Sequence, residues 1–254
     1  MNYFSPNTAA ERYHIGRPNF HDTSINSIKS YLKLENKLNS ALDIACGTGL
    51  STQALLSIAT EVFGTDSSEA MLNLAFQKDK ITYQLAKAEA QPFANQSFDL
   101  ITVCSGVHWF DIDKFLQEAG RLLKNKAWLI VYDNFFLAKM NGNPLFKEWH
   151  ENVYLKNFPA PLRNDKYNWT NEVLNQMNFE LAHEENFTNT VSFSKKELIL
   201  YLTTQSNIIS AVEEKSITYP EVEMWLDNEI SQFFKDEKAS ILFGNWIKYL
   251  HNQK

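Results

Sequence analysis

The sequence predicts an α/β fold built around a doubly wound, largely parallel β-sheet. Between residues 41 and 135, short apolar segments typical of buried strands alternate with segments of helical periodicity. The first strand ends in a glycine turn, Gly47-Thr48-Gly49, directly before a predicted helix. The second strand ends in a carboxylate, Asp66, about 20 residues further on. Doubly wound sheets bind ligands at the carboxyl ends of their strands, so we expect a site there.

The glycine turn is the first candidate ligand site. Leu42 and Ile44 belong to an apolar strand, and Gly47 and Gly49 let the backbone turn sharply and approach a ligand. The free N–H groups at the start of a helix from Ser51 to Leu56 would face the same ligand. Because any strand-to-helix turn can need glycine, the turn by itself is compatible with a nucleotide-type ligand or with a purely structural role.

The second strand supplies the next candidate. It runs over residues 61–66, and in doubly wound folds an acid at this place accepts hydrogen bonds from ribose hydroxyls. Asp66 could instead cap the following helix, but Ser67 and Ser68 already offer a cap.

The other expected elements follow from periodicity and from turn residues. The expected helices are Thr8–Tyr13, His21–Leu34, Phe115–Leu123, Phe146–Phe158, residues 170–178, a helix capped by Ser194 that ends at Thr203, and Glu221–Lys235. The expected further strands begin at Thr82, within Ser97–Phe110, at Ala127–Tyr132, Asn186–Phe193 and Ile241–Leu250, the last with a bulge or turn at Gly244-Asn245.

This order of motifs resembles the class I S-adenosylmethionine-dependent methyltransferases that act on small molecules. It is similar to the branch that includes ubiquinone/menaquinone biosynthesis and trans-aconitate methyltransferases, mainly over residues 10–135. The resemblance implies a Rossmann-like, seven-stranded sheet of order 3-2-1-4-5-7-6, with the last strand antiparallel and with helical cap insertions. It implies one domain over residues 1–254, with an N-terminal helical lid (about 1–40), a cofactor-binding core (about 41–135), and a cap insertion with C-terminal strands (about 136–254).

The resemblance also implies S-adenosyl-L-methionine as cofactor, S-adenosyl-L-homocysteine as product, and a set of cofactor contacts. Asp43 matches the acid that orients the methionine moiety, often through water, and Asp66 the acid that binds both ribose hydroxyls. Gly47 and Gly49 match glycines beside the cofactor, whereas Ala45 stands where many members have glycine. The positions that match the adenine surroundings and the backbone after strand four are Ser67 and Met71, Ala88 and Glu89, and Ser105.

The N-terminal segment resembles the family's Tyr-x-x-x-Arg-Pro sequence, which covers the cofactor pocket. Tyr13 could then pack over the methionine end, and Arg17 could pair with the cofactor carboxylate through a charge-assisted contact. The alternative for Arg17 is a surface side chain next to the helix-breaking Pro18.

His108 and Trp109 match a histidine-tryptophan pair near the reactive methyl group. Because the ordinary pKa of histidine lies near neutrality, His108 is the candidate catalytic base. A pocket contact without proton transfer, or no role, are its alternatives. Trp109 could face the sulfonium with its π system, or pack in the core.

A metal ion is not expected. Catechol-type methyltransferases hold magnesium with an acid after strand four and an Asp-Asn pair after strand five. Asp133-Asn134 stands at the second place, but Ser105 occupies the first, and Asp111 and Asp113 lie a few residues too far along.

Composition limits the remaining possibilities. The net charge of −6 argues against a nucleic-acid surface, and no apolar run is long enough to span a bilayer. Cys46 and Cys104 are expected as reduced, buried thiols, although a disulfide is conceivable. With no signal peptide recognised, we expect a cytoplasmic protein, as a monomer or homodimer. The predicted activity is methyl transfer to a small-molecule acceptor, at oxygen of a carboxylate or hydroxyl. The alternatives are carbon or nitrogen methylation, or a non-catalytic S-adenosylmethionine-binding regulator.

Overall fold

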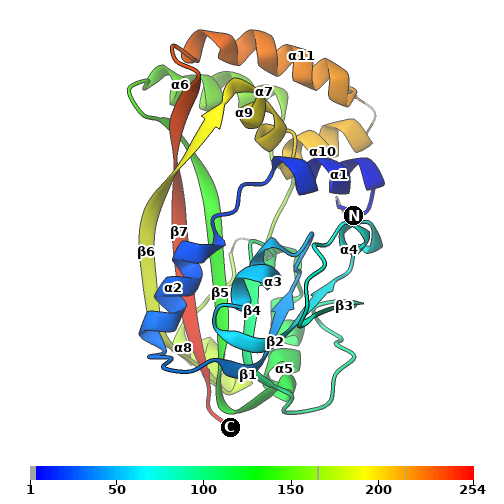
Figure 1. The fold of residues 1–254 in the computed structure, drawn as a ribbon, viewed down its shortest axis with the longest axis vertical. Coiled ribbons are helices and arrows are strands. Elements are labelled where there is room, and N and C mark those ends of the chain that lie inside the picture. The colour runs from blue at the N-terminus through cyan, green and yellow to red at the C-terminus, as the bar shows by residue number, and fades with distance from the viewer. Residues whose placement is uncertain (1–3, 165, 215) are drawn as a thin grey trace. The chain divides into compact units, whose positions relative to one another are not determined.

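The computed structural model describes residues 4–164, 166–214 and 216–254. Its strands form a seven-stranded sheet of order β3-β2-β1-β4-β5-β7-β6, which confirms the predicted topology (Figure 1). β7 runs against β5 and β6, so the sheet is mixed (Figure 1). The strands are β1 (Leu38–Ile44), β2 (Ala59–Asp66), β3 (Ile81–Leu85), β4 (Phe98–Cys104), β5 (Leu123–Met140), β6 (Phe179–Ser194) and β7 (Lys238–Asn252).

Helices connect the strands and extend from the second half of the chain. The α-helices are α1 (Asn7–Gly16), α2 (His21–Tyr31), α3 (Leu50–Leu55), α4 (Glu69–Asn73), α5 (Ile112–Leu122), α6 (Leu145–Trp149), α7 (Leu155–Asn157), α8 (Asn171–Leu174), α9 (Lys195–Leu202), α10 (Ser206–Glu213) and α11 (Tyr219–Ile230). The 3₁₀ turns are η1 (Val107–Trp109), η3 (Asn175–Met177) and η4 (Ser231–Phe233), and η2 (His150–Tyr154) is a π-helical turn.

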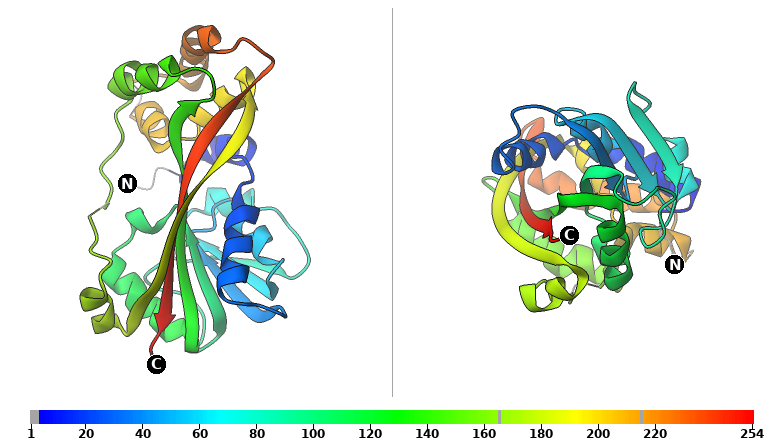
Figure 2. Two further views of the ribbon diagram at one scale, coloured as in Figure 1. Left: turned by 90° about the vertical axis from the view of Figure 1, so that its left-hand side faces the viewer. Right: turned by 90° about the horizontal axis from the view of Figure 1, so that it is seen from below.

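The chain forms two compact units. The first contains residues 1–18, 135–162 and 187–245, and the second contains residues 19–134, 163–186 and 246–254. β5, β6 and β7 each contribute residues to both units. Figure 2 shows these three strands as long, twisted neighbours. The chain enters each unit more than once, so neither unit is a continuous segment of the sequence.

The second unit has the parallel half of the sheet at its centre. β1 pairs in parallel with β2 and β4, and β4 with β5. β4 and the centre of β5 are mainly apolar and buried, as expected where a parallel sheet is covered on both faces. α5 packs its apolar side against the sheet core, with Phe115, Leu116 and Ala119 fully buried beside Ile101 and Leu129. This packing fixes the strands whose carboxyl ends carry the candidate site.

The first unit has its own core of aromatic and aliphatic side chains. Phe146, Trp149 and Tyr154 of the 145–157 helical segment pack with residues of α9 and α11, including Leu198 and Leu226. The segment expected as one helix over Phe146–Phe158 is therefore helical, but a π turn interrupts it. Most of its aromatic side chains are buried in this core.

Several expected bounds were wrong. α10 was not predicted, β5 and β6 are much longer than expected, and α2 ends at Tyr31 rather than Leu34. Gly244-Asn245 is no turn, because β7 continues through it. The glycine has a packing reason instead, since a Cβ at Gly244 would lie 2.4 Å from the ring of Phe135.

Candidate active site at the carboxyl edge of the sheet

The candidate site lies within the second unit, on the loops that follow β1, β2, β3 and β4. The strand pairings align Ile44 with both Thr65 and Val103, and Asp66 with Leu85. The four loops therefore leave the same edge of the sheet side by side. This arrangement brings together the predicted residues from Asp43 to Trp109, which lie far apart in the sequence.

Asp43 is fully buried under the glycine turn. It accepts hydrogen bonds from the hydroxyls of Ser51 (2.6 Å), Thr52 (2.7 Å) and Thr102 (3.0 Å). Burial raises the pKa of Asp43 to about 6, and the three hydroxyl donors oppose this rise. Because these donors come from α3 and β4, Asp43 ties the start of α3 and the neighbouring strand to β1.

The glycine turn is built from left-handed residues. Ala45, Gly47 and Gly49 have φ values of 57°, 54° and 84°. The N–H of Gly49 donates to the carbonyl of Cys46 at 2.9 Å, which closes the turn. For Ala45, the left-handed conformation costs roughly 1–2 kcal/mol that glycine would avoid.

Asp66 joins the turn after β1 to the loop after β2. Its Oδ2 accepts from the N–H of Gly47 and its Oδ1 from the N–H of Ser68, both at 2.8 Å. Burial raises the pKa of this carboxyl group, and the backbone N–H donors oppose the rise. A carboxylate offers about four acceptor sites, so Asp66 can accept further donors such as ribose hydroxyls. The cap of α4 is Ser68, whose hydroxyl accepts from the N–H of Met71, so Asp66 is not needed there.

Two buried hydroxyls lie on the segments that Asp66 joins. The Oγ1 atoms of Thr48 and Thr65 are buried and have no hydrogen-bond partner among the described residues. Buried polar atoms are usually satisfied by protein, water or a ligand. Thr48 lies in the glycine turn and Thr65 directly precedes Asp66 on β2, so both hydroxyls belong to the two segments that Asp66 joins.

The other predicted contact residues lie on the next two loops. Met71 and Ala88 are buried, Ser67 is exposed, and Glu89 is partly buried. The Oε1 atom of Glu89 accepts from the N–H of Asp111 at 2.9 Å, which joins the loop after β3 to the start of α5. The predicted adenine contact of Glu89 therefore coincides with a structural contact.

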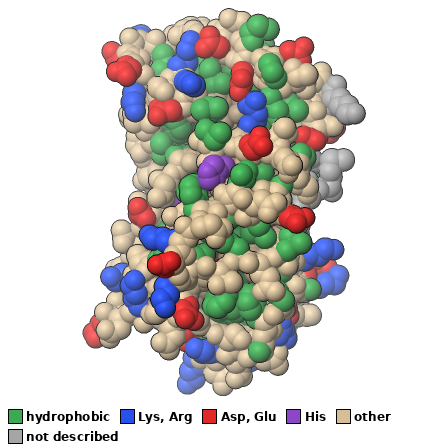
Figure 3. All heavy atoms as spheres, turned by 45° about the vertical axis from the view of Figure 1, so that its right-hand side comes forward, with side chains coloured by type: hydrophobic (Ala, Val, Ile, Leu, Met, Phe, Trp, Pro, Cys, Tyr) green, Lys and Arg blue, Asp and Glu red, His purple; other side chains and the backbone are tan. Residues whose placement is uncertain are grey.

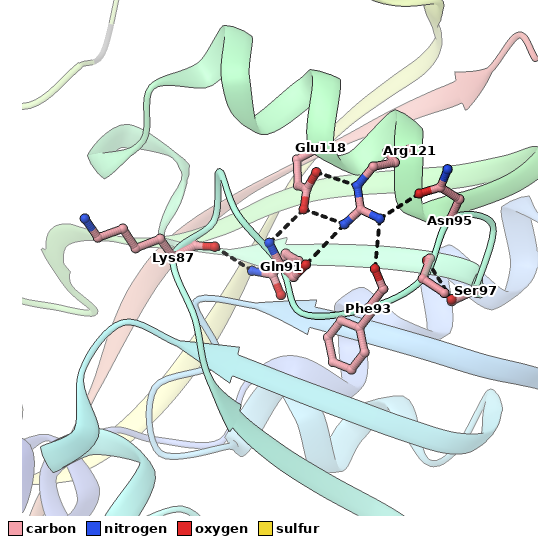
Figure 4. Close-up of polar contacts among 8 residues, drawn as sticks. Lys87, Gln91, Phe93, Asn95, Ser97, Glu118 and Arg121 are labelled. Atoms are coloured by element: carbon pink, nitrogen blue, oxygen red, sulfur yellow. Dashed lines mark hydrogen bonds and ion pairs between the residues drawn. The ribbon is translucent and has the colours of Figure 1, made fainter.

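An arginine of α5 holds the loop that carries Glu89 (Figure 4). Arg121 donates to the carbonyls of Gln91 (3.1 Å) and Phe93 (2.8 Å) and to the side chain of Asn95 (2.8 Å). Arg121 also forms an ion pair with Glu118, which accepts from the N–H of Gln91 at 2.7 Å. Sequence reasoning missed this network, although an Arg three residues after a Glu on a predicted helix was the available signal.

The loop after β4 holds the predicted reactive residues. Ser105 has φ 55° and donates its hydroxyl to Asp133 Oδ1 at 2.5 Å. His108 and Trp109 are partly buried in η1, with ring centroids 4.7 Å apart. Arg163 lies 5.6 Å from the centroid of the Trp109 ring, and the carbonyl of His108 accepts from the N–H of Asn164 at 3.0 Å.

Tyr13 and Arg17 belong to the first unit. The guanidinium of Arg17 lies 4.7 Å from the ring centroid of Tyr13 and 5.2 Å from that of Tyr201, and it donates to the carbonyl of Thr204 at 3.2 Å. It has no acidic partner among the described residues, whereas Arg12 pairs with Glu223. The predicted contact of Arg17 with the cofactor remains a prediction.

Other groups complete the description of the site. Cys46 and Cys104 are free thiols whose pKa burial raises. Among the described residues, no group of three or more His, Cys, Asp or Glu side chains could hold a metal ion. None of the described helices has the length and hydrophobicity that spanning a lipid bilayer requires.

Comparisons with known proteins address the same residues. A family model described as a methyltransferase domain matches residues 42–131. A proposed methyltransferase of Dictyostelium discoideum is 32% identical over 138 residues, which are 54% of this chain and 51% of the relative. A ubiquinone/menaquinone biosynthesis C-methyltransferase of Geotalea uraniireducens is 31% identical over 130 residues, 47% of this chain and 54% of the relative. The chain thus spans about half the length of these curated relatives.

Solved structures show the same fold at low sequence identity. A proposed type II methyltransferase from Anaeromyxobacter dehalogenans matches with a TM-score of 0.68 at 17% identity, over 92% of this chain and 97% of that chain. Haemonchus contortus phosphoethanolamine N-methyltransferase 2, in complex with S-adenosylhomocysteine, matches with a TM-score of 0.51 at 16% identity, over 97% of this chain and 59% of that chain. Residues 42–131 therefore match a methyltransferase domain, and the described chain shares the fold of these solved methyltransferase structures.

Proposed function

We propose that the protein transfers a methyl group from S-adenosylmethionine to a small-molecule acceptor, at oxygen of a carboxylate or hydroxyl. The observation that carries this proposal is the arrangement of Asp66, whose two oxygens bind backbone N–H groups of Gly47 and Ser68. This carboxylate joins two loops and retains acceptor sites for ribose hydroxyls. The match of residues 42–131 to a methyltransferase domain and the fold support methyl transfer, whereas oxygen as the acceptor atom is our proposal.

The residues of the site have distinct roles in this proposal. S-adenosylmethionine, when bound, supplies an electrophilic methyl group on its sulfonium. Asp66 would hold the ribose, Met71 and Ala88 would line the adenine, and Asp43 would act through ordered water because it is fully buried. The chain mainly aligns donor and acceptor, a contribution on the order of 7–11 kcal/mol.

His108 and Trp109 are the residues we assign to the acceptor side. A hydroxyl acceptor must lose its proton during transfer, and His108 is the candidate base. A carboxylate acceptor is already ionised at neutral pH and needs no base. We propose that no metal is required, because Ser105 stands where catechol-type enzymes have an acid. The Ser105 hydroxyl also donates a hydrogen bond to the carboxylate of Asp133.

We also propose that the acceptor is small rather than a nucleic acid. Figure 3 shows basic and acidic side chains interspersed on the face that it draws, and the net charge is −6. A nucleic-acid surface needs a concentration of positive charge.

A labelled-methyl assay tests the proposal. The protein is incubated with S-adenosylmethionine labelled in the methyl group and with a panel of phenols, aliphatic carboxylates, amines and active-methylene compounds. The account predicts label in a phenol or carboxylate, and His108→Gln should abolish transfer to phenols while sparing carboxylates. Label only in carbon or nitrogen acceptors would contradict oxygen methylation. Cofactor binding without any transfer would favour the non-catalytic regulator.

A further inference from the structure

Gly49 of the glycine turn packs against a tyrosine from β3, the strand two places from β1 in the sheet. Gly49 has φ 84°, and a Cβ there would lie 2.1 Å from the hydroxyl oxygen of Tyr83 and 2.9 Å from its Cζ. Both distances are too short for a real side chain. The space that a side chain at position 49 would need is therefore occupied by Tyr83, a residue of β3.

A second glycine, Gly64, leaves space for the Tyr83 ring because it has no side chain. Gly64 of β2 is paired with Tyr83 of β3 on one side and with Asp43 of β1 on the other. A Cβ at Gly64 would lie 2.7 Å from the Tyr83 ring. The ring therefore crosses β2 at the one residue without a side chain and reaches the turn after β1.

The hydroxyl of Tyr83 closes a ring of contacts around the turn. It donates to the carbonyl of Phe76 at 3.1 Å. The N–H of Phe76 donates to the carbonyl of Thr48 at 3.1 Å, and Thr48 is the residue between Gly47 and Gly49. Tyr83 thus contacts the turn directly at Gly49 and holds the loop that bonds to Thr48.

The phenol is suited to remain a donor. Burial is the main cause that raises the pKa of Tyr83 above its ordinary value, and a contact with Thr52 opposes the rise. Thr52 in turn donates to Asp43 at 2.7 Å. Tyr83 is therefore protonated at neutral pH and lies next to the polar group that supports the turn.

We propose that Tyr83 is a positioning residue for the cofactor, and that Gly49 is a glycine in order to admit Tyr83 rather than only to approach the ligand. Tyr83 fixes the backbone of the turn at residues 47–49 before the cofactor arrives. This inference rests on the proposed function in one respect: that this turn binds S-adenosylmethionine.

The first test compares Tyr83 with a second partly buried tyrosine whose hydroxyl also donates a hydrogen bond but does not contact the glycine turn. Tyr167 is also partly buried in the second unit, and its hydroxyl donates to Asp113 at 2.8 Å, outside the turn. S-adenosylhomocysteine is titrated calorimetrically into the protein, Tyr83→Phe and Tyr167→Phe, well below the melting temperature of each. We expect Tyr83→Phe to raise the Kd at least fivefold and Tyr167→Phe to leave it within twofold. Equal affinity of Tyr83→Phe and the unchanged protein, even with a lower melting temperature, would show a structural role only and overturn the proposal.

The second test uses the contact between the two residues. Gly49→Ala places its methyl group against the phenol oxygen, so it should raise the Kd strongly. Tyr83→Phe removes that oxygen, although the contact with Cζ and the left-handed φ remain. We expect the double variant Gly49→Ala/Tyr83→Phe to bind at least threefold more tightly than Gly49→Ala, which reverses the sign of the Tyr83→Phe effect.

The outcomes separate the inference from the function on which it rests. If the fold-change in Kd of the double variant equals the product of the fold-changes of the two single variants, the proposed contact does not govern binding and the inference fails. If Gly49→Ala does not fold, the comparison of Tyr83→Phe with Tyr167→Phe decides. If the unchanged protein does not bind S-adenosylhomocysteine, the proposed function fails first and the inference with it.

Discussion

Ala45 and Gly106 face each other on the turns that follow β1 and β4. A Cβ at Gly106 would lie 2.8 Å from the Cβ of Ala45. Ala45 has a φ of 57°, which favours glycine. The alanine in the turn after β1 is therefore accommodated by a missing side chain in the turn after β4, and the two positions should be coupled.

Gly106→Ala should lower the free energy of unfolding by about 1–3 kcal/mol, because two methyl groups then compete for one space. Ala45→Gly by itself relieves the left-handed strain but adds freedom to the unfolded chain, so we expect a change within about 1 kcal/mol. In the double variant the loss caused by Gly106→Ala should largely disappear. Urea unfolding of the four proteins measures this coupling, and strictly additive effects would contradict the contact.

The buried carboxyl of Asp43 should make stability depend on pH. Its pKa is raised in the folded protein to about 6, above its ordinary value of 3.8, so the folded state holds a proton that the unfolded state releases. The stability should therefore fall as the pH rises from about 4 to about 6, by roughly 3 kcal/mol from this group. Asp43→Asn should remove this part of the pH dependence. Urea unfolding of both proteins at several pH values measures it, and parallel curves would contradict the prediction.

His21 should contribute a pH dependence of the opposite sign. It is buried with Nδ1 3.1 Å from the hydroxyl of Tyr132, and burial lowers its pKa from 6.5 to about 3. Below pH 6.5 the unfolded chain binds a proton that the folded protein does not, so stability is lost as the pH falls through this window. Between pH 7 and pH 5 the loss should be about 2 kcal/mol. His21→Gln should show a smaller loss over the same range, and an equal loss would mean that folding does not lower the pKa of His21.

Much of the fold could be predicted because the hydrophobicity of a segment in the sequence agrees with its burial in the folded sheet. β4 and the centre of β5 are mainly apolar, β1 and β2 have short apolar segments, and glycine, serine or aspartate marks where these segments end. The missed parts lack such agreement. β6 begins with Phe179-Glu180-Leu181, but the alternation stops there because residues 182–184 are all exposed, so it is too short to mark a strand. α10 follows α9 after only three residues, with no strong break between them.

The candidate site could be predicted from the sequence where a particular residue type recurs at a fixed spacing for a particular chemical role. Asp66 and the glycines could be found because a strand end, a glycine turn and an acid occur at a fixed spacing. Tyr83 could not, because its role depends on a side chain that crosses a neighbouring strand at Gly64. The partners of Asp43 are similar, since Thr102 meets it only through the pairing of β1 with β4. The alignment of residues on neighbouring strands depends on how the strands pair in the sheet, and a local stretch of sequence does not show it.

Two arginines of the N-terminal segment allow a matched comparison. Arg12 is paired with Glu223 and stacked on Tyr219, whereas Arg17 has no acidic partner among the described residues. If Arg17 pairs with the cofactor carboxylate, Arg17→Ala should weaken S-adenosylmethionine binding severalfold, because a charge-assisted contact is lost. Arg12→Ala should leave the Kd within twofold while lowering stability. Unchanged affinity of Arg17→Ala in a calorimetric titration would assign Arg17 a structural role.

The measurement that tests the central claim most directly is the binding of S-adenosylhomocysteine to the protein, Asp66→Asn and Asp99→Asn. Asp99 is the matched control, because it also accepts from a backbone N–H, that of Ser40 at 3.0 Å, but lies at the start of β4 and not at the carboxyl edge. Ligand at 100 times its Kd should stabilise the unchanged protein by about 2.7 kcal/mol and raise its melting temperature. We predict that Asp66→Asn raises the Kd at least tenfold and Asp99→Asn less than twofold. No binding by the unchanged protein, or equal binding by Asp66→Asn, would contradict the account.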